Sequence, residues 1–250
     1  MAKDTNVINN YETTVELPSK GLLYDNIPKE VTLRMITTAE EKFLYGSTSN
    51  AFTKVLKNCI VSPKEINIDE LLPVDELFLI FQLRIHTYGP EYRIEGTCPH
   101  CGNKEVFTIN LDEMPCYYLD DNFVEPIDIE LPKCGSTVSI KLLRKKDYEA
   151  VNRQAKKLAK NTKANPRELE YILRMARYIK AIDGKEVDAI QAQSFVEKLT
   201  GYDSAKFWND LDKLVKCGID TVADVTCGAC NENYELEYGI SSEFFRPKFE

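Results

Sequence analysis

Two Cys-x-x-Cys pairs constrain this sequence more than any other feature. Cys98 and Cys101 form the first pair, and Cys227 and Cys230 form the second. A Cys-x-x-Cys turn presents two thiolates from one tight loop, and structural zinc takes four such ligands at Zn–S distances of about 2.3 Å. Because each pair lies between segments with the alternating pattern of β-strands, we predict one structural Zn²⁺ bound by all four cysteines of a zinc ribbon.

The two pairs are far apart in the chain. Residues 102–226, which are 125 positions, separate them, whereas a compact two-pair site has roughly 15 to 20 intervening residues. We therefore predict a ribbon that is split by a long insertion. A metal bound there would join the two ends of the inserted part.

Other uses of the cysteines and histidines stay open. A thioredoxin-like redox pair would begin a helix, but both pairs precede strands, and a catalytic zinc would keep one coordination position open. His100, inside the first pair, is either an additional ligand or a solvent-facing loop residue, and His86 is expected to be a core or rim residue. The other cysteines are expected to be ordinary thiols, with a second metal site as the alternative: Cys59, Cys116, Cys134 and Cys217.

Composition and motifs argue against several classes of protein. The chain has 250 residues and a formal net charge of −8, which does not favour general nucleic-acid binding. It contains no Gly-rich phosphate loop and no local catalytic pattern, so we expect neither an enzyme nor a small-molecule substrate. It also lacks a long apolar run and a signal peptide. We therefore expect no association with membranes, and we expect the cysteine thiols to be reduced.

One segment has the opposite charge to the rest. Residues 141–167 contain ten basic residues against two acidic ones. The simplest interpretation is a solvated helix face, and the alternative is an electrostatic contact with an acidic neighbour, such as another copy of the chain. The candidate residues of this basic face are Lys145, Lys146, Arg153, Lys156 and Lys157.

Hydrophobic periodicity predicts an α+β fold in three parts. Residues 1–14 are expected to be a flexible N-terminal arm. Residues 15–143 and 218–250 are expected to form an α+β body, which contains an N-terminal α/β segment and the split zinc ribbon. Residues 144–217 are expected to form an inserted helical lobe. Pro73 opens a buried helix that ends at Gly89. The lobe is expected to be helical throughout, with Ile179 on the apolar face of its second helix.

Five short motifs together resemble a known family. They are Leu17-Pro-Ser-Lys-Gly-Leu-Leu-Tyr24, Leu71-Leu-Pro-Val-Asp75, Leu83-Arg-Ile-His-Thr-Tyr-Gly-Pro-Glu-Tyr92, Cys98-Pro-His-Cys-Gly102 and Phe244-Phe-Arg-Pro247. In this order and spacing, they are similar to the T4-type bacteriophage baseplate proteins.

The resemblance implies a subunit of the contractile-tail baseplate, in its hub or wedge region, or a factor that helps the hub assemble. Such a protein has no catalytic role, binds other baseplate and tail proteins, is made in the host cytoplasm and resides in the virion. The partner contacts would then be Leu22, Leu23, Tyr24, Phe244, Phe245 and Arg246, with docking on the chain's own core as the alternative. Two further possibilities are an assembly chaperone absent from the mature virion and a zinc-ribbon protein that binds nucleic acid in a regulatory role.

Overall fold

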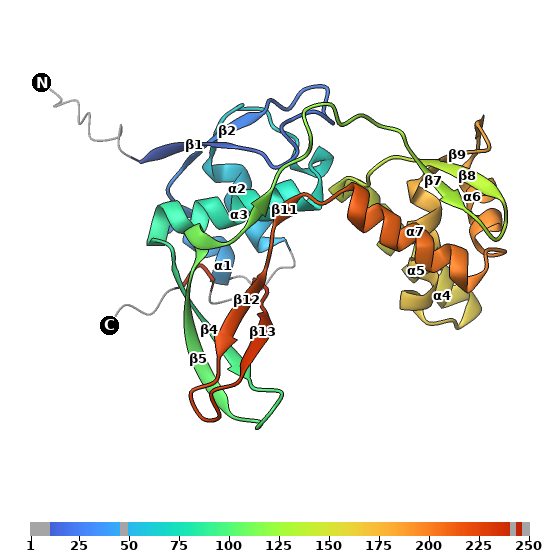
Figure 1. The fold of residues 1–250 in the computed structure, drawn as a ribbon. Helices are drawn as coiled ribbons and strands as arrows, with labels where there is room; N and C mark the ends of the chain where they lie inside the picture. The colour runs from blue at the N-terminus through green and yellow to red at the C-terminus, as the bar shows by residue number, and fades with distance from the viewer. Residues whose placement is uncertain (1–10, 46–49, 241–243, 247–250) are drawn as a thin grey trace, which may run out of the picture.

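The computed structural model describes residues 11–45, 50–240 and 244–246. It has a body, made of the described residues between 11 and 119 and between 218 and 246, and a lobe, made of residues 127–215 (Figure 1). The chain leaves the body after strand β6 (Cys116–Tyr117) and returns through strand β11 (Gly218–Ile219), which pairs with β6. The lobe is therefore an insertion. None of the described helices is long and apolar enough to cross a membrane.

The N-terminal part of the body combines a small sheet with three helices. Antiparallel strands follow the order β1 (Glu12–Glu16), β2 (Glu30–Arg34), β3 (Ile60–Ser62). The helices are α1 (Thr38–Tyr45), α2 (Ala51–Cys59) and α3 (Pro73–Tyr88), with short 3-10 helices at Ile68–Glu70 and Leu111–Glu113. Residues 12–14 of the predicted arm belong to β1 because Thr13 and Thr14 pair with β2, and residues 1–10 lie outside the described part.

Helix α3 lies at the centre of the body. Pro73 occupies its first turn, where a missing N–H costs nothing, and Gly89 ends it with a φ of 85°. Arg84 of α3 is buried, and its guanidinium donates hydrogen bonds to the carbonyls of Phe244, Gly89 and Glu91. A buried arginine thus fixes the end of the helix, the next strand and the C-terminal segment to one another.

Two β-hairpins complete the body and lie side by side in Figure 1. The first hairpin pairs β4 (Glu91–Thr97) with β5 (Lys104–Asn110), and the second pairs β12 (Val222–Thr226) with β13 (Asn233–Glu237). In β4 and β12 buried and exposed residues alternate, because each hairpin packs one face on the other and exposes the opposite face.

The lobe has a sheet and four helices. Its antiparallel strands follow the order β10 (Lys185–Glu186), β9 (Ile179–Ile182), β8 (Ser136–Ile140), β7 (Ile127–Leu131). The helices are α4 (Lys145–Thr162), α5 (Pro166–Tyr178), α6 (Ala189–Val196) and α7 (Gly201–Leu214). A second hydrophobic core joins them, to which Leu72 of the body also contributes; its lobe residues include Ile129, Val138, Met175, Ile179 and Phe207.

Two predictions about the lobe need correction. The hairpin of β7 and β8 belongs to the lobe and not to the body, because its buried side chains contribute to the lobe's core. Ile179 begins strand β9 and does not lie on a helix. The turn after β9 has Asp183 at φ 51° and Gly184 at φ 74°, and two successive left-handed residues are typical of a two-residue hairpin turn. The Asp-Gly pair was the local signal for this hairpin.

Candidate metal centre

Both cysteine pairs lie in hairpin loops of the same backbone design. In the first loop the Cys98 N–H donates to the Asn103 carbonyl at 2.9 Å, and the Gly102 N–H donates to the Cys98 carbonyl at 2.9 Å. The second loop repeats both bonds from Cys227 and Asn231, at 3.0 and 2.9 Å. Gly102 and Asn231 occupy the same position with left-handed φ angles of 74° and 58°, which glycine and asparagine tolerate best.

The four predicted ligand residues meet at one point. Their Sγ atoms all lie within 4.8 Å of one another, and the Cys98–Cys230 and Cys101–Cys227 pairs are each 3.7 Å apart. A tetrahedron with Zn–S bonds of about 2.3 Å has edges of roughly 3.8 Å. The sulfur positions therefore fit a tetrahedral metal ion. The cluster includes neither His100 nor the other four cysteines.

Close packing of the two hairpins brings the cysteine loops together. Gly96 of β4 is buried against β13, where a Cβ atom would lie 2.8 Å from Leu236 Cδ2 and 3.0 Å from the Tyr234 hydroxyl. The rings of Phe107 and Tyr234 meet edge to face, with centroids 6.2 Å apart. Glycine at this position permits an approach that a larger residue would obstruct.

Glu105 connects the two loops, a role that the sequence pattern did not predict. Its carboxylate accepts hydrogen bonds from the Gly228 N–H at 2.9 Å and from the Asn103 side chain at 3.0 Å. The backbone N–H groups of Cys230 and Ala229 lower the pKa of the Cys227 thiol to about 7. These two N–H groups favour the thiolate of Cys227, the form that binds metal, whereas burial and the neighbouring thiols raise the pKa of Cys230 in the same loop.

The C-terminal aromatic residues are part of the chain's own core. Phe244 and Phe245 are 0% and 2% exposed, and the Phe244 ring lies 5.0 Å from the rings of both Phe81 and Tyr92. Arg246 donates to the Leu44 carbonyl at 2.5 Å. Of the two interpretations of this segment, the structure favours docking on the core, so Phe244 and Phe245 are not exposed contact residues.

The other predicted contact segment is exposed at Leu22 and half-buried at its other end. Leu22 is 42% exposed, whereas Leu23 and Tyr24 are half-buried against the core. The Tyr24 hydroxyl donates to the buried carboxylate of Asp75 and accepts the Leu72 N–H at 2.8 Å. Burial raises the pKa values of both Tyr24 and Asp75. Partner binding by Leu22 stays a prediction.

The predicted basic face divides into two groups. Lys145 and Lys146 lie at the start of α4 and pair with Glu76 and Glu70 of the body. The remaining three, Arg153, Lys156 and Lys157, are exposed on the lobe. The first group therefore attaches the lobe to the body. The second group stays exposed to solvent, with Arg153 3.5 Å from Glu149 of the same helix.

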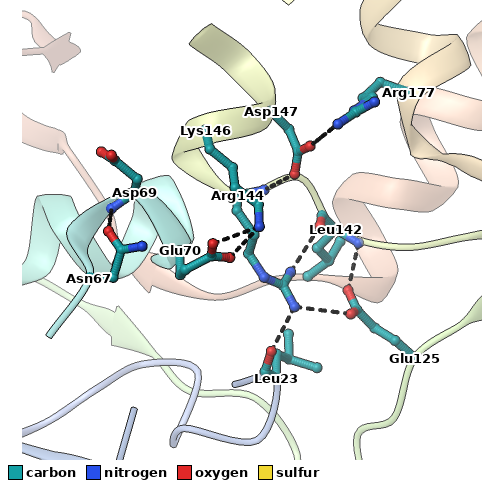
Figure 2. Close-up of polar contacts among 10 residues, drawn as sticks. All are labelled: Leu23, Asn67, Asp69, Glu70, Glu125, Leu142, Arg144, Lys146, Asp147 and Arg177. Atoms are coloured by element: carbon teal, nitrogen blue, oxygen red, sulfur yellow. Dashed lines mark hydrogen bonds and ion pairs between the residues drawn. The ribbon is translucent and has the colours of Figure 1, made fainter. Parts of the chain in front are cut away.

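Arg144 is the centre of the joint between body and lobe. Figure 2 shows its guanidinium between the carbonyls of Leu23 and Leu142, at 2.7 and 2.8 Å, with the Glu125 carboxylate at 3.2 Å. Asp147 accepts the Arg144 N–H at 3.0 Å and an Arg177 guanidinium N–H at 2.7 Å. A cavity of about 630 Å³ lies beside this network, and much of its charged lining is already paired.

The comparison with known proteins gives a match over nearly the whole chain. The family described as T4 bacteriophage base plate protein matches residues 8–246. No curated protein and no solved structure matches the chain.

Proposed function

The chain belongs to the family of T4 bacteriophage base plate proteins, and on this premise we propose that it is a non-enzymatic structural component of the contractile-tail baseplate. In this role it resides in the hub or wedge region of the virion and binds other baseplate proteins after its synthesis in the host cytoplasm. The observation that supports this function is the family match, which spans both body and lobe.

The proposal includes a structural Zn²⁺ held by Cys98, Cys101, Cys227 and Cys230, which makes the paired hairpins a split zinc ribbon. The sulfur spacing of 3.7 Å supports this assignment. Four thiolates would fill a tetrahedral coordination sphere and leave no position for a reacting water. The donor set therefore favours a structural ion that ties the entry and exit of the inserted lobe.

Two other functions remain as alternatives. A baseplate assembly factor would share the family and the metal site but would leave before the particle is complete. A regulatory nucleic-acid-binding protein would use the exposed basic residues of α4. The family match is compatible with the first alternative, because an assembly factor would also be a baseplate protein. The net charge of −8 argues against the second alternative, since nucleic acid is itself negatively charged.

Quantitative mass spectrometry of purified phage particles tests the proposed residence in the baseplate. We expect the protein in whole particles and in isolated baseplates, at a constant ratio to the other baseplate proteins. Detection in infected-cell assembly intermediates but not in particles would replace the structural role with the assembly role. Absence from both would contradict the proposal.

Metal analysis of the purified chain tests the zinc assignment separately. We expect about one zinc per chain, as for a site with four thiolate ligands, and loss of this zinc in a Cys98→Ser variant. Cys134→Ser is the matched control because Cys134 is also a free cysteine but lies at an exposed hairpin turn outside the cluster. Another metal, or equal zinc in both variants, would refute the assignment.

A further inference from the structure

The outer face of the second hairpin carries acidic residues at adjacent positions. Asp224 of β12 lies directly opposite Glu235 of β13, and Glu237 lies opposite Val222 in the same sheet. All four side chains are exposed. Like charges directly opposite each other destabilise an antiparallel pair, and in the described part of the chain no cation pairs with these carboxylates. We call Asp224, Glu235 and Glu237 the acidic face.

Helix α4 carries the complementary feature on the lobe. Arg153, Lys156, Lys157 and Lys160 are exposed and follow the spacing i, i+3, i+4, i+7, so they share one face of the helix. We call these four residues the basic stripe. Within the described ranges the acidic partner of the stripe is Glu149, 3.5 Å from Arg153. Like charges at i and i+4 destabilise a helix, and among the described residues Lys156, Lys157 and Lys160 have no acidic partner.

The opposite face of α4 is packed against the lobe. Val151 and Ala155 are buried and pack with Leu173 of α5 in a small core. The helix is therefore fixed on the lobe with its basic stripe directed to solvent. A contact through the stripe requires no unfolding and no rearrangement of the lobe.

The two charged surfaces are similar in size. Seven residues of helix rise make the basic stripe roughly 10 Å long. Two residues along a strand and one interstrand spacing make the acidic face roughly 7 Å by 5 Å. Several lysine and arginine side chains of the stripe can therefore reach the three carboxylates together.

We propose that the acidic face of one copy binds the basic stripe of α4 in a second copy. The two surfaces belong to different parts of the molecule, the second hairpin and the lobe (Figure 1), so the contact is head to tail. Repetition of such a contact produces a ring when the rotation closes and an open chain when it does not.

A second copy of the chain can pair with both charged surfaces, whereas a nucleic acid can pair only with the basic stripe. Phosphates would pair with the basic stripe but would be repelled by the acidic face and by the net charge of −8. Head-to-tail association compensates both sets of charges with one contact. This inference goes beyond the proposed baseplate role and does not depend on the metal, because neither surface includes a cysteine.

A charge-swap experiment on the full-length, metal-loaded chain tests the proposal. The helix variant carries Lys156→Glu and Lys160→Glu, and the hairpin variant carries Asp224→Lys and Glu235→Lys. Sedimentation velocity measures association at about 50 mM and about 500 mM salt, before and after nuclease treatment. The higher salt shortens the screening length from roughly 14 to 4 Å. We expect the unmodified chain to associate about tenfold more weakly at the higher salt, as a few exposed ion pairs allow.

The decisive sample is the mixture of the two variants. In the helix variant the stripe carries two acidic and two basic residues and so no net charge, and in the hairpin variant both surfaces have a net positive charge. Each variant alone should therefore lose association. In the mixture the acidic faces of the helix variant meet the basic α4 of the hairpin variant, so association should return. Recovery in the mixture also shows that both variants are folded.

A matched control changes the same charge on the other hairpin. Glu91→Lys with Glu95→Lys alters two exposed residues of β4, and this variant should associate like the unmodified chain. A chain that is monomeric at low salt, a mixture that fails to associate, or association that disappears on nuclease treatment would each overturn the proposal. The last outcome would assign the basic stripe to nucleic acid.

Discussion

Gly96→Ala tests whether packing between the two hairpins sets the geometry of the metal site. The added Cβ would lie 2.8 Å from Leu236 Cδ2 and 3.0 Å from atoms of Phe107 and Tyr234. Distances below about 3.4 Å require the neighbours to move, and overpacking of this kind costs about 1–3 kcal/mol. Because two of these neighbours belong to β13, any strain that their side chains do not relieve by turning aside pushes the second hairpin away from the first.

The expected consequence is weaker metal binding with an intact set of ligands. If the whole strain is relieved when the hairpins separate, about 1–3 kcal/mol corresponds to about 5- to 150-fold lower zinc affinity. Competition with a chromophoric chelator measures this affinity directly. Urea unfolding with and without zinc measures how much of the loss appears as reduced stability of the folded chain.

Gly201→Ala is the control for this experiment. Gly201 opens α7 in the lobe, and a Cβ there has no neighbour within 4 Å, so zinc affinity should not change. Alanine in an unstrained position stabilises a fold by about 0.4–1 kcal/mol. If Gly96→Ala binds zinc as tightly as Gly201→Ala, the cysteine loops do not depend on hairpin packing and the reasoning is refuted.

Three further substitutions test other parts of the structure. Phe244→Ala should destabilise the body by about 3–5 kcal/mol in urea unfolding, because it removes a buried ring from a filled core. Arg144→Met should leave the Glu125 carboxylate without its cation, at a cost of about 3–5 kcal/mol, and hydrogen exchange should become faster at the joint and not in the lobe core. The Arg34 guanidinium, with two bonds of 2.9 and 3.1 Å, lowers the pKa of Glu40 to about 2. This folded pKa is below the unfolded value of about 4.3, so the pair stabilises the fold above that pH and loses its effect as the pH falls towards 2; Glu40→Gln should flatten this part of the pH profile.

Each of these predictions has a result that would count against it. A Phe244→Ala chain within about 1 kcal/mol of the parent would mean that the C-terminal segment is not part of the core. Unchanged exchange at the joint in Arg144→Met would show that the apolar contacts there suffice without the arginine. Parallel acid profiles for the parent and Glu40→Gln, measured without zinc so that loss of metal does not contribute, would contradict the pKa shift.

Local patterns in the sequence predicted much of the secondary structure. Pro73 and Gly89 mark the ends of α3 as predicted, and Asn165 caps α5 by accepting the Arg167 N–H at 3.0 Å. These features depend on residues within a few positions of one another, which is why a single sequence contains the information. The strand that begins at Ile179 was wrongly predicted as helix, because its apolar residue continues the helical spacing of α5 and the Asp-Gly turn after it was not used as a hairpin signal.

The spacing of the cysteines determined that the chain must return to its first pair after a long insertion, and it predicted which four residues meet. Only the tertiary structure decided the roles of other residues. Phe244 is fixed by Arg84, 160 positions earlier, and Lys145 pairs with Glu76, 69 positions earlier. An aromatic C-terminal segment has the same local sequence pattern whether it is exposed or buried. The same holds for a lysine that is solvated or paired with a carboxylate. The difference arises from contacts between distant segments, and these form only when the whole chain is folded.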